Sequence, residues 1–449
     1  MNSRNFIIIP KQIVTADSKN NIFRNTAIEI VDGKIERFID LKKESVESYD
    51  NKIYHFPRLT LIPGFIQTHV HLCQTLFRGL ADDLELLDWL KERIFPFENE
   101  HTKPSLAASA KLGIYELQLS GTTTVLDMGT INHHEVVFDT LIGSKMRAIS
   151  GKCMVDLNDL YPKFKESTKD SLASSYELAK QYHNSENGRI KYGFAPRFVL
   201  SCSEELLKET YEMTKDFSGS IYHSHTSENK GEIEAVRKMH NMENIEYFNS
   251  IGVLHKNTVL AHGIHVSDFE RSIIKETGTR IVHCPSANLK LGSGIANIPK
   301  YLDEGITISL GADGPPCNNN LSMFTEMRLA ALIQKPVHGP TSMDAKTVFR
   351  LATIEGAKAL GLENEIGSLE AGKKADMVLL DLEQPDQPLL DRDANLYSGI
   401  VYSASTKNVV HVMIEGKWVV ENKESLIFDK DEIYEAGRSE LEKLLKRIS

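Results

Sequence analysis

Residues that can hold a metal ion or move a proton recur in this chain near the ends of apolar, strand-like stretches. Five stretches carry histidine, glutamate or aspartate there: THVH (68–71), HSHTSE (223–228), LAHGIH (260–265), HCPSAN (283–288) and LGADG (310–314). Imidazole and carboxylate groups are ligands of zinc and related divalent cations, and they are also common proton carriers in hydrolases. Taken together, the five stretches predict one metal ion that activates a water molecule.

His69 and His71 are separated by one residue in a stretch with the composition of a β-strand. Side chains of a strand alternate between its two faces, so both imidazoles point to the same side, about 7 Å apart, and can converge on one cation. His223 and His225 form a second pair of this kind, of which only one need be a ligand. We favour His225 because its spacing lets it bind the metal while Glu228, three residues later, reaches a substrate.

The remaining groups each have an ordinary structural alternative. A histidine that follows an apolar run, such as His262, His265 or His283, is more often a hydrogen-bonded core residue than a catalyst. Glu228 has the alternative of a solvated loop carboxylate, and Asp313 that of a helix cap. A buried carboxylate is costly unless it is paired or bound to a metal. The coherent order of these groups along the chain favours a shared metal site.

Residues 63–364 alternate apolar strand-like segments with longer amphipathic runs. Eight strands are expected within GFIQTHVH, TTTVLDMG, MRAISGKCMVD, RIKYGFAP, SIYHSHTSE, TVLAHGIHV, TRIVHCPSAN and TISLGADG. Helix-like runs such as 104–120, 202–217 and 322–335 lie between or after them. This pattern predicts an α/β fold, a (β/α)8 TIM-like barrel. Functional groups of that fold lie at the carboxyl ends of the strands, which is where the histidines and carboxylates fall.

The two ends of the chain have a different character. Residues 1–62 and 365–449 contain short runs rich in β-branched residues, with turn pairs such as Asp32-Gly33 and Gly416-Lys417. We expect both ends to build one small composite β-sandwich domain. The last stretch, from Lys430 onward, has helical apolar spacing and basic residues near its end, so a C-terminal helix is expected.

Composition narrows the class of protein. The chain has 449 residues, a net charge of −10, 41% hydrophobic and 25% charged residues, which is ordinary for a globular protein. The negative charge argues against a nucleic-acid partner and a polybasic membrane anchor. The five cysteines include no CxxC pair, and no apolar run approaches the length of a membrane span or a signal-peptide core. We expect a cytoplasmic protein with neither disulfides nor a membrane partner.

Longer motifs around these residues resemble the amidohydrolase superfamily, and within it the branch of purine and triazine deaminases. The motifs are PGFIQTHVH (63–71), HCPSANLKLGSGIA (283–296), GADGPPCNNNLSMFTEMRLA (311–330) and EIGSLEAGKKADMVLLD (365–381), and the resemblance covers nearly the whole chain. It implies a single divalent metal ion bound by four residues: His69, His71, His225 and Asp313. Zinc is expected, with iron(II) or manganese(II) as alternatives, because imidazole and carboxylate ligands suit all three.

The same resemblance implies roles for the catalytic groups. Glu228 would shuttle protons, Asp313 would take a proton from the attacking water, and His262 would lie beside the attacked carbon. All of these positions carry the matching residue, which argues against a metal-binding protein without turnover.

Within this branch the chain resembles two groups of enzymes. Trp89 and Glu98, in DDLELLDWLKERIFPFE (82–98), resemble the adenosine-type deaminases, in which the matching residues pack on the nucleoside and bind the ribose diol. Gln74, Arg197 and Phe198 resemble the guanine deaminases, in which the matching side chains hold the purine base. We therefore expect these five residues to bind the substrate.

Lys152 stands where enzymes that clamp a homocysteine carry an arginine. Because lysine lacks the bidentate fork for a carboxylate, a small or uncharged 5′ substituent is implied. The expected activity is hydrolytic deamination of an adenosine-type nucleoside, such as 5′-deoxyadenosine or 5′-methylthioadenosine, to ammonia and the inosine-type product. The alternatives are a guanine deaminase that acts on the free base and a triazine amino- or chlorohydrolase. The resemblance leaves room for a homo-oligomer.

Overall fold

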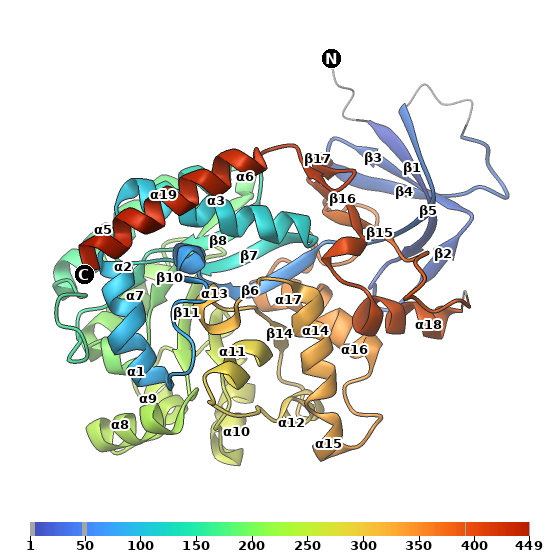
Figure 1. Ribbon diagram of the computed structural model, residues 1–449. Coiled ribbons are helices and arrows are strands. Elements are labelled where there is room, and N and C mark those ends of the chain that lie inside the picture. The colour runs from blue at the N-terminus through green and yellow to red at the C-terminus, as the bar shows by residue number, and fades with distance from the viewer. Residues whose placement is uncertain (1–4, 47–51, 391, 449) are drawn as a thin grey trace.

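The structure consists of two β-sheets and a surrounding layer of helices (Figure 1). It is a computed structural model that describes residues 5–46, 52–390 and 392–448. Residues 1–4, 47–51, 391 and 449 of the two predicted terminal segments lie outside the described part. One sheet is a parallel barrel built from the middle of the chain, and the other is a mixed sheet built from both ends.

Each of the eight stretches expected to form a strand contains one strand of the barrel. In chain order these strands are β6 (Phe65–Val70), β7 (Thr122–Met128), β8 (Arg147–Gly151), β10 (Ile190–Pro196), β11 (Ile221–Thr226), β12 (Thr258–His262), β13 (Arg280–His283) and β14 (Ile308–Leu310). Neighbours in the sheet follow the order of the chain and pair in parallel. A short strand, β9 (Cys153–Met154), adds to β10. The predicted (β/α)8 barrel is confirmed.

Helices connect the barrel strands and cover the outside of the barrel. The longer ones are α3 (Lys103–Leu119), α4 (Glu135–Gly143), α5 (Thr168–Tyr182), α7 (Glu204–Thr214), α8 (Lys230–His240), α9 (Asn244–Ser250), α10 (Asp268–Thr277), α14 (Met323–Leu332), α16 (Ala345–Leu351) and α17 (Ile354–Leu360). The helix-like runs predicted at 104–120, 202–217 and 322–335 correspond to α3, α7 and α14. Within the described ranges, no helix combines the length and the apolar character that crossing a bilayer requires.

Shorter helical turns lie mainly in the loops at the ends of strands. They are α1 (Leu86–Trp89), α2 (Phe95–Asn99), α6 (Ser185–Gly188), α11 (Pro285–Lys290), α12 (Ile298–Asp303), α13 (Pro315–Asn318), α15 (Lys335–His338) and α18 (Asp393–Ser398), with the 3-10 or π turns η1 (Leu72–Phe77), η2 (Leu90–Ile94), η3 (Val199–Ser201), η4 (Gly399–Ser403) and η5 (Thr406–Asn408). The segment between β6 and α3 is rich in such turns, because η1, α1, η2 and α2 follow one another there.

Side chains of the barrel strands alternate between the interior and the surrounding helices. In β12, Leu260 belongs to an apolar cluster that includes the helix residues Phe248 and Ile274. Its neighbour Val259 belongs instead to a second cluster, with Ile149 and Val282 of other strands. This alternation is the geometry of a strand whose two faces are both buried.

The barrel closes at residues that were expected to do chemistry. Between β14 and β6, the backbone N–H of Asp313 donates to the carbonyl oxygen of His69 at 3.1 Å, and Val70 pairs with Asp313 as an isolated parallel bridge. Gly311 passes so close that a Cβ atom there would lie 2.7 Å from the same carbonyl oxygen. The contacts that close the sheet therefore also place Asp313 beside His69.

The mixed sheet is assembled from both ends of the chain, as expected. Its strands are β1 (Phe6–Val14), β2 (Ile22–Arg24), β3 (Thr26–Val31), β4 (Lys34–Asp40) and β5 (Lys52–Pro63) from one end, and β15 (Met377–Asp381), β16 (Val409–Ile414), β17 (Lys417–Glu421) and β18 (Glu424–Ser425) from the other. The two parts join where β5 and β15 pair antiparallel. Hydrogen bonds link all nine strands into one sheet.

The C-terminal helix α19 (Lys430–Ile448) is present where it was expected. It runs alongside α3 of the barrel (Figure 1) and also contacts α2. Leu444 packs with Phe77 and Phe97, and Gly437 approaches α3 so closely that a Cβ atom there would lie 2.5 Å from Leu112 Cδ1. The last helix of the chain therefore covers the barrel, although it follows the strands of the mixed sheet.

A buried ion pair ties the mixed sheet to the barrel. Arg147, at the start of β8, donates from Nε to Asp376 Oδ2 at 2.8 Å and from Nη2 to Asp376 Oδ1 at 3.3 Å. The side chains of both residues are almost fully buried, at 3% and 2% exposed. Glu415, just after β16, adds a second carboxylate at 3.2 Å from Arg147 Nη2. These contacts fix the orientation of β15 and β16 against the barrel.

We expect Arg147→Ala to destabilise the protein by about 3–5 kcal/mol, because it leaves buried carboxylates without their cation. The midpoint of urea unfolding measures the effect. Lys180→Ala is the matched control, because it breaks an exposed pair with Glu177 and is expected to change stability by no more than about 0.5 kcal/mol. Equal, small shifts in the two variants would contradict a coupling role for the buried pair.

Candidate metal and catalytic site

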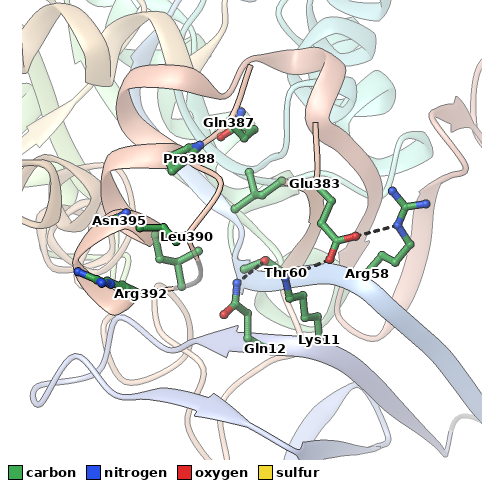
Figure 2. Close-up of a pocket in the computed structure, with 13 residues that line it drawn as sticks. Lys11, Gln12, Arg58, Thr60, Glu383, Gln387, Pro388, Leu390, Arg392 and Asn395 are labelled. Carbon is green, nitrogen blue, oxygen red and sulfur yellow. Dashed lines mark hydrogen bonds and ion pairs between the residues drawn. The ribbon is translucent and has the colours of Figure 1, made fainter. Parts of the chain in front are cut away.

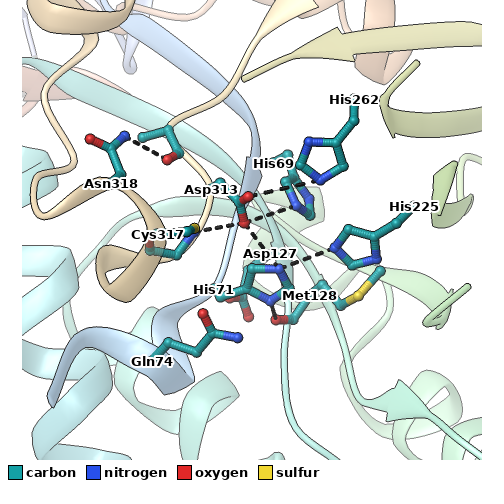
Figure 3. A network of polar contacts seen from close by, with 12 residues as sticks. His69, His71, Gln74, Asp127, Met128, His225, His262, Asp313, Cys317 and Asn318 are labelled. Atoms are coloured by element: carbon teal, nitrogen blue, oxygen red, sulfur yellow. Dashed lines mark hydrogen bonds and ion pairs between the residues drawn. The ribbon is translucent and has the colours of Figure 1, made fainter. Parts of the chain in front are cut away.

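Four side chains from distant parts of the chain converge at the mouth of the barrel (Figure 3). His69 and His71 lie on and just after β6, His225 lies on β11, and Asp313 follows β14. Asp313 Oδ1 is 3.3 Å from the Nε2 atoms of both His69 and His71, and His71 Nε2 is 3.3 Å from His225 Nε2. Ligands of a tetrahedral zinc ion, at about 2.0–2.1 Å from the metal, are separated by about this distance.

The other ring nitrogens of His71 and His225 are bound to backbone carbonyl groups. His71 Nδ1 lies 2.8 Å from the oxygen of Met128, and His225 Nδ1 lies 2.7 Å from the oxygen of Arg197. A carbonyl oxygen only accepts hydrogen bonds, so each Nδ1 must carry the hydrogen. Both Nε2 lone pairs are therefore left free for a metal, which is the arrangement that orients histidine ligands in metalloproteins.

His69 reaches the same state through a second histidine. Its Nδ1 lies 2.8 Å from His223 Nε2, and His223 Nδ1 lies 2.9 Å from the carbonyl oxygen of Val259. Because that carbonyl requires a donor, His223 carries its hydrogen on Nδ1 and accepts from His69 at Nε2. His69 Nε2, a fully buried atom with no hydrogen-bond partner among the described residues, is then a bare lone pair directed at the centre.

The charges of these groups suit a divalent cation. Burial lowers the pKa of His71 to about 3 and also holds the pKa values of His69 and His225 below the usual range, so all three rings are neutral near pH 7. Burial alone would raise the pKa of Asp313, but its histidine neighbours, among them His262, whose own pKa is raised, hold it well below its ordinary value. Three neutral imidazoles and one carboxylate therefore present the nitrogen and oxygen donors that a single divalent metal ion requires.

Two further groups beside this centre can carry protons. His262 Nε2 lies 3.4 Å from Glu228 Oε2 and 3.8 Å from Asp313 Oδ2. Burial raises the pKa of Glu228 to about 7, so both its protonated and its ionised form are accessible near neutrality. Burial lowers the pKa of His262, but the carboxylates of Glu228 and Asp313 outweigh it and raise the value overall. His262 Nδ1 lies 2.8 Å from Asn288 Oδ1, which fixes the ring.

The backbone at these strand ends adopts a conformation that side chains rarely occupy. Ser227 has φ 49°, His262 has φ 76° and Asp313 has φ 63°. The left-handed region costs non-glycine residues about 1–3 kcal/mol and persists only where the surroundings impose it. Three such residues around one centre indicate that the strand ends are held for function.

A narrow cavity opens onto the centre. It is lined by His71, Leu86, Trp89, Leu90, Arg197, Phe198, His225, Glu228, Glu232, His262, Leu291 and Asp313. The structure thus brings most of the predicted site residues to one cavity, with a wall of apolar and aromatic side chains opposite the polar groups. A few polar groups on an otherwise apolar wall are typical of a small-molecule site.

Gln74 and Glu98 are not among the described residues that line this cavity. Glu98 is fully buried; its carboxylate accepts hydrogen bonds from Gln74 Nε2 at 2.8 Å and from Arg197 Nη1 at 3.2 Å. Glu98 therefore contacts Arg197, which itself reaches the cavity, and Gln74 contacts Glu98. That Gln74 and Glu98 bind the substrate directly stays a prediction.

Sequence reasoning missed several residues of the site. Glu232 lines the cavity and accepts the backbone N–H groups of Glu228 and Asn229 at 2.8 and 3.3 Å, as the third residue of the capped helix α8. The capping pattern Asn-x-x-Glu was visible in the sequence. Asn288 gave no comparable signal, because its contact with His262 depends on how two loops meet.

Figure 2 shows a second cavity, of about 380 Å³, between the mixed sheet and α18. Lys11 and Arg58 lie there, and both pair with Glu383, at 3.0 and 2.9 Å. The described residues that line it include no histidine or cysteine. The chemistry of the protein is therefore assigned to the barrel mouth.

Comparison with known proteins agrees with this geometry. The chain belongs to the amidohydrolase family, whose profile matches residues 60–419. A 5′-deoxyadenosine deaminase of Methanobrevibacter smithii is 35% identical over 412 residues, 92% of each chain. A 5-methylthioadenosine/S-adenosylhomocysteine deaminase of Acetivibrio thermocellus is 35% identical over 432 residues, 96% of this chain and 97% of that one. The crystal structure of an adenosine deaminase from Xanthomonas campestris with bound zinc has a TM-score of 0.91 at 27% identity and covers 98% of both chains.

Variants of His71 and His223 separate a metal ligand from the residue that orients one. We expect the wild-type chain to bind one equivalent of zinc and His71→Ala to lose it. His223→Leu should bind zinc about 10- to 100-fold more weakly, because His69 loses its hydrogen-bond acceptor. Competition with a chromogenic chelator, together with elemental analysis, measures both effects. The exposed His338→Ala is the control, and two tightly bound equivalents in the wild type would contradict the site.

Proposed function

We propose that this chain is a metal-dependent deaminase that removes the amino group from C6 of an adenosine-type nucleoside. The observation that carries the proposal is the position of Glu228 and His262, which line one cavity with three of the four candidate ligands. Two proton-carrying groups beside a metal centre serve hydrolysis, and a protein that only binds metal has no use for them. The substrates named for the two relatives support the same class of substrate.

A divalent cation held by the three imidazoles and Asp313 would supply the Lewis acid that lowers the pKa of the attacking water. The two oxygens of Asp313 face different groups: Oδ1 faces His69 and His71, and Oδ2 faces His262. Asp313 is thus placed to accept a proton as the water oxygen attacks C6. His262, oriented by Asn288, donates a hydrogen bond from Nε2 to the oxygen that joins the ring.

Glu228 moves the second proton. In its protonated form it donates to the ring nitrogen adjacent to C6, so negative charge does not build up on the purine. A proton relayed to the amine then lets the C6–N bond break, so that water and the nucleoside become ammonia and the inosine-type product. A pKa of about 7 suits a group that must both give and take a proton near neutral pH.

We assign the recognition of the substrate to the rest of the cavity. Trp89 and Phe198 offer aromatic surface for the purine and the sugar. Arg197 lies between the cavity and Glu98, so its guanidinium is held in place by a buried carboxylate. Direct contact of Gln74 and Glu98 with the substrate is also part of the proposal; Gln74 Nε2 donates to Glu98, which pairs with Arg197. Zinc is the proposed metal, supported by the 3.3 Å separations between Asp313 and His69, Asp313 and His71, and His71 and His225, and by the zinc of the related adenosine deaminase.

We propose that residues 63–364 form the catalytic barrel and that residues 1–62 and 365–449 form the attached domain. The sheets support this division, because β5 ends at Pro63 and β15 begins at Met377. Gly64 lies between the two sheets, and a Cβ atom there would lie 2.2 Å from Thr123 Oγ1. α19 is the exception in this division, since it packs on the barrel.

Glu228→Gln tests the proton shuttle. The amide keeps the size of the side chain but cannot transfer a proton, so we expect kcat for nucleoside deamination to fall by about a hundred- to ten-thousand-fold. Zinc content should stay at the wild-type level, because Glu228 is not a ligand. Ammonia release and elemental analysis measure the two quantities, and Glu234→Gln, an exposed position on the same helix, is the control. Wild-type turnover in Glu228→Gln would remove this residue from the mechanism.

The charges around the cavity lead to a prediction about the 5′ substituent. Lys152 is buried and paired with Glu166, and it is not among the residues that line the cavity. Arg197, which does line it, is paired with Glu98. A substrate with a carboxylate on its 5′ substituent would therefore find no uncommitted lysine or arginine among the described residues that line the cavity.

We expect kcat/KM to be higher for 5′-deoxyadenosine and 5′-methylthioadenosine than for S-adenosylhomocysteine, by about tenfold or more. The reason is that the carboxylate of S-adenosylhomocysteine would lose water at the cavity without gaining a cationic partner. Ammonia release from a panel of purines measures this ratio. Guanine belongs in the panel, because Arg197 and Phe198 line the cavity. Faster turnover of guanine than of any nucleoside would overturn the proposed substrate class.

A further inference from the structure

A buried carboxylate outside the cavity joins the segment after β13, which contacts His262 through Asn288, to the loop after β14, which carries Asp313. Glu326 lies on α14, is fully buried, and is not among the residues that line the cavity. Its Oε1 accepts hydrogen bonds from Ser286 Oγ at 2.6 Å and from Asn318 Nδ2 at 2.9 Å, and its Oε2 accepts from the backbone N–H of Ser286 at 3.2 Å. All three donors belong to loops at the barrel mouth.

One branch of this network ends at Asp313. Asn318 Nδ2, besides donating to Glu326, lies 2.7 Å from the carbonyl oxygen of Ala312, the residue before Asp313. Figure 3 shows Asn318 making this contact beside Asp313. Asp313 itself has φ 63°, so its backbone needs support from outside the strand. Glu326 supplies that support through one intervening side chain.

The other branch ends at His262. Ser286 lies on α11, and two residues later on the same short helix Asn288 Oδ1 accepts the hydrogen of His262 Nδ1 at 2.8 Å. His262 has φ 76°, the second strained position of the site. Because Glu326 holds Ser286 by both its hydroxyl and its backbone N–H, it fixes the start of α11 and with it the position of Asn288.

A buried carboxylate with hydrogen-bond partners of this kind can also have a purely structural role. Glu270 is its structural counterpart: it is also buried, and it accepts the backbone N–H and the hydroxyl of Ser267 at 2.9 and 3.0 Å and the backbone N–H of Ile245 at 3.3 Å. Glu270 caps α10 and is not among the described residues that line the cavity. The two residues differ in what their hydrogen-bond donors connect to. The donors to Glu326 lie next to residues that contact or precede His262 and Asp313, whereas the donors to Glu270 do not.

We propose that Glu326 is a positioning residue that sets the distance between His262 and Asp313 by holding Ser286 and Asn318 on one carboxylate. The inference rests on the proposed function for its effect on turnover, because these two groups act on the same attacking oxygen. Its effect on the metal centre does not depend on any substrate, because Asp313 is a candidate ligand.

Glu326→Gln is the first test, with Glu270→Gln as the matched control. A glutamine at position 326 keeps the size of the side chain but replaces one acceptor oxygen by a donor, which opposes the donors that face it. We expect kcat to fall about 10- to 100-fold and zinc affinity, measured by chelator competition, to weaken in the same range. KM should change by less than about threefold, because Glu326 does not line the cavity. Glu270→Gln should leave kcat and zinc affinity at wild-type values.

Ser286→Ala is the variant to measure if Glu326→Gln does not fold, because it removes only a single hydroxyl group. It should lower kcat about three- to tenfold, the loss of one charge-assisted hydrogen bond acting at a distance. The inference is overturned if kcat and zinc affinity of the tested variant match the wild type, or if Glu270→Gln loses as much. A wild-type chain that binds zinc but deaminates no purine would overturn the proposed function instead, and zinc affinity would still report on Glu326.

Discussion

The structure depends on the convergence of three imidazole nitrogens and one carboxylate oxygen: Asp313 Oδ1 lies 3.3 Å from His69 Nε2 and from His71 Nε2, and His71 Nε2 lies 3.3 Å from His225 Nε2. The Nδ1 atom of each ring already makes a hydrogen bond. In His71 and His225 the partner is a backbone carbonyl oxygen, and in His69 it is His223. The chain therefore buries acceptor groups that face one another with no hydrogen between them, which is unfavourable in the absence of a cation. A bound divalent ion removes that cost, so metal binding and the stability of the barrel mouth are coupled.

The parallel barrel is what brings these groups together. Carboxyl ends of neighbouring strands meet at the same edge, so residues far apart in the sequence become neighbours there. The closing contact, from the N–H of Asp313 to the carbonyl oxygen of His69, joins the last strand to the first at the level of the site. The mixed sheet reinforces this arrangement from outside, because Arg147 at the start of β8 is bound to Asp376 next to β15.

The sequence allowed the eight barrel strands and the composite sheet to be predicted, because each depends on local spacing. The metal ligands stay a prediction, which the convergence of the four side chains supports. The one-residue gap between His69 and His71 determines that they share a face of a strand, whatever the rest of the fold. Contacts between loops carry no such signal. Glu98, for example, binds Arg197, which is 99 residues away, and no local pattern indicates that contact. Asn288, Ser286 and Glu326 likewise acquire their relation to His262 only when three separate segments pack together.

The site divides into a chemical part and a recognition part that the fold holds differently. The candidate metal ligands, Glu228 and His262 lie on or just after barrel strands, whose positions are fixed by hydrogen bonds to the strands on both sides. Much of the apolar wall, by contrast, comes from Leu86, Trp89 and Leu90, in the run of short turns between β6 and α3. Loops of this kind tolerate change far better than strand ends do. Substitutions in residues 72–99 can therefore alter which purine enters while the hydrolytic centre stays intact.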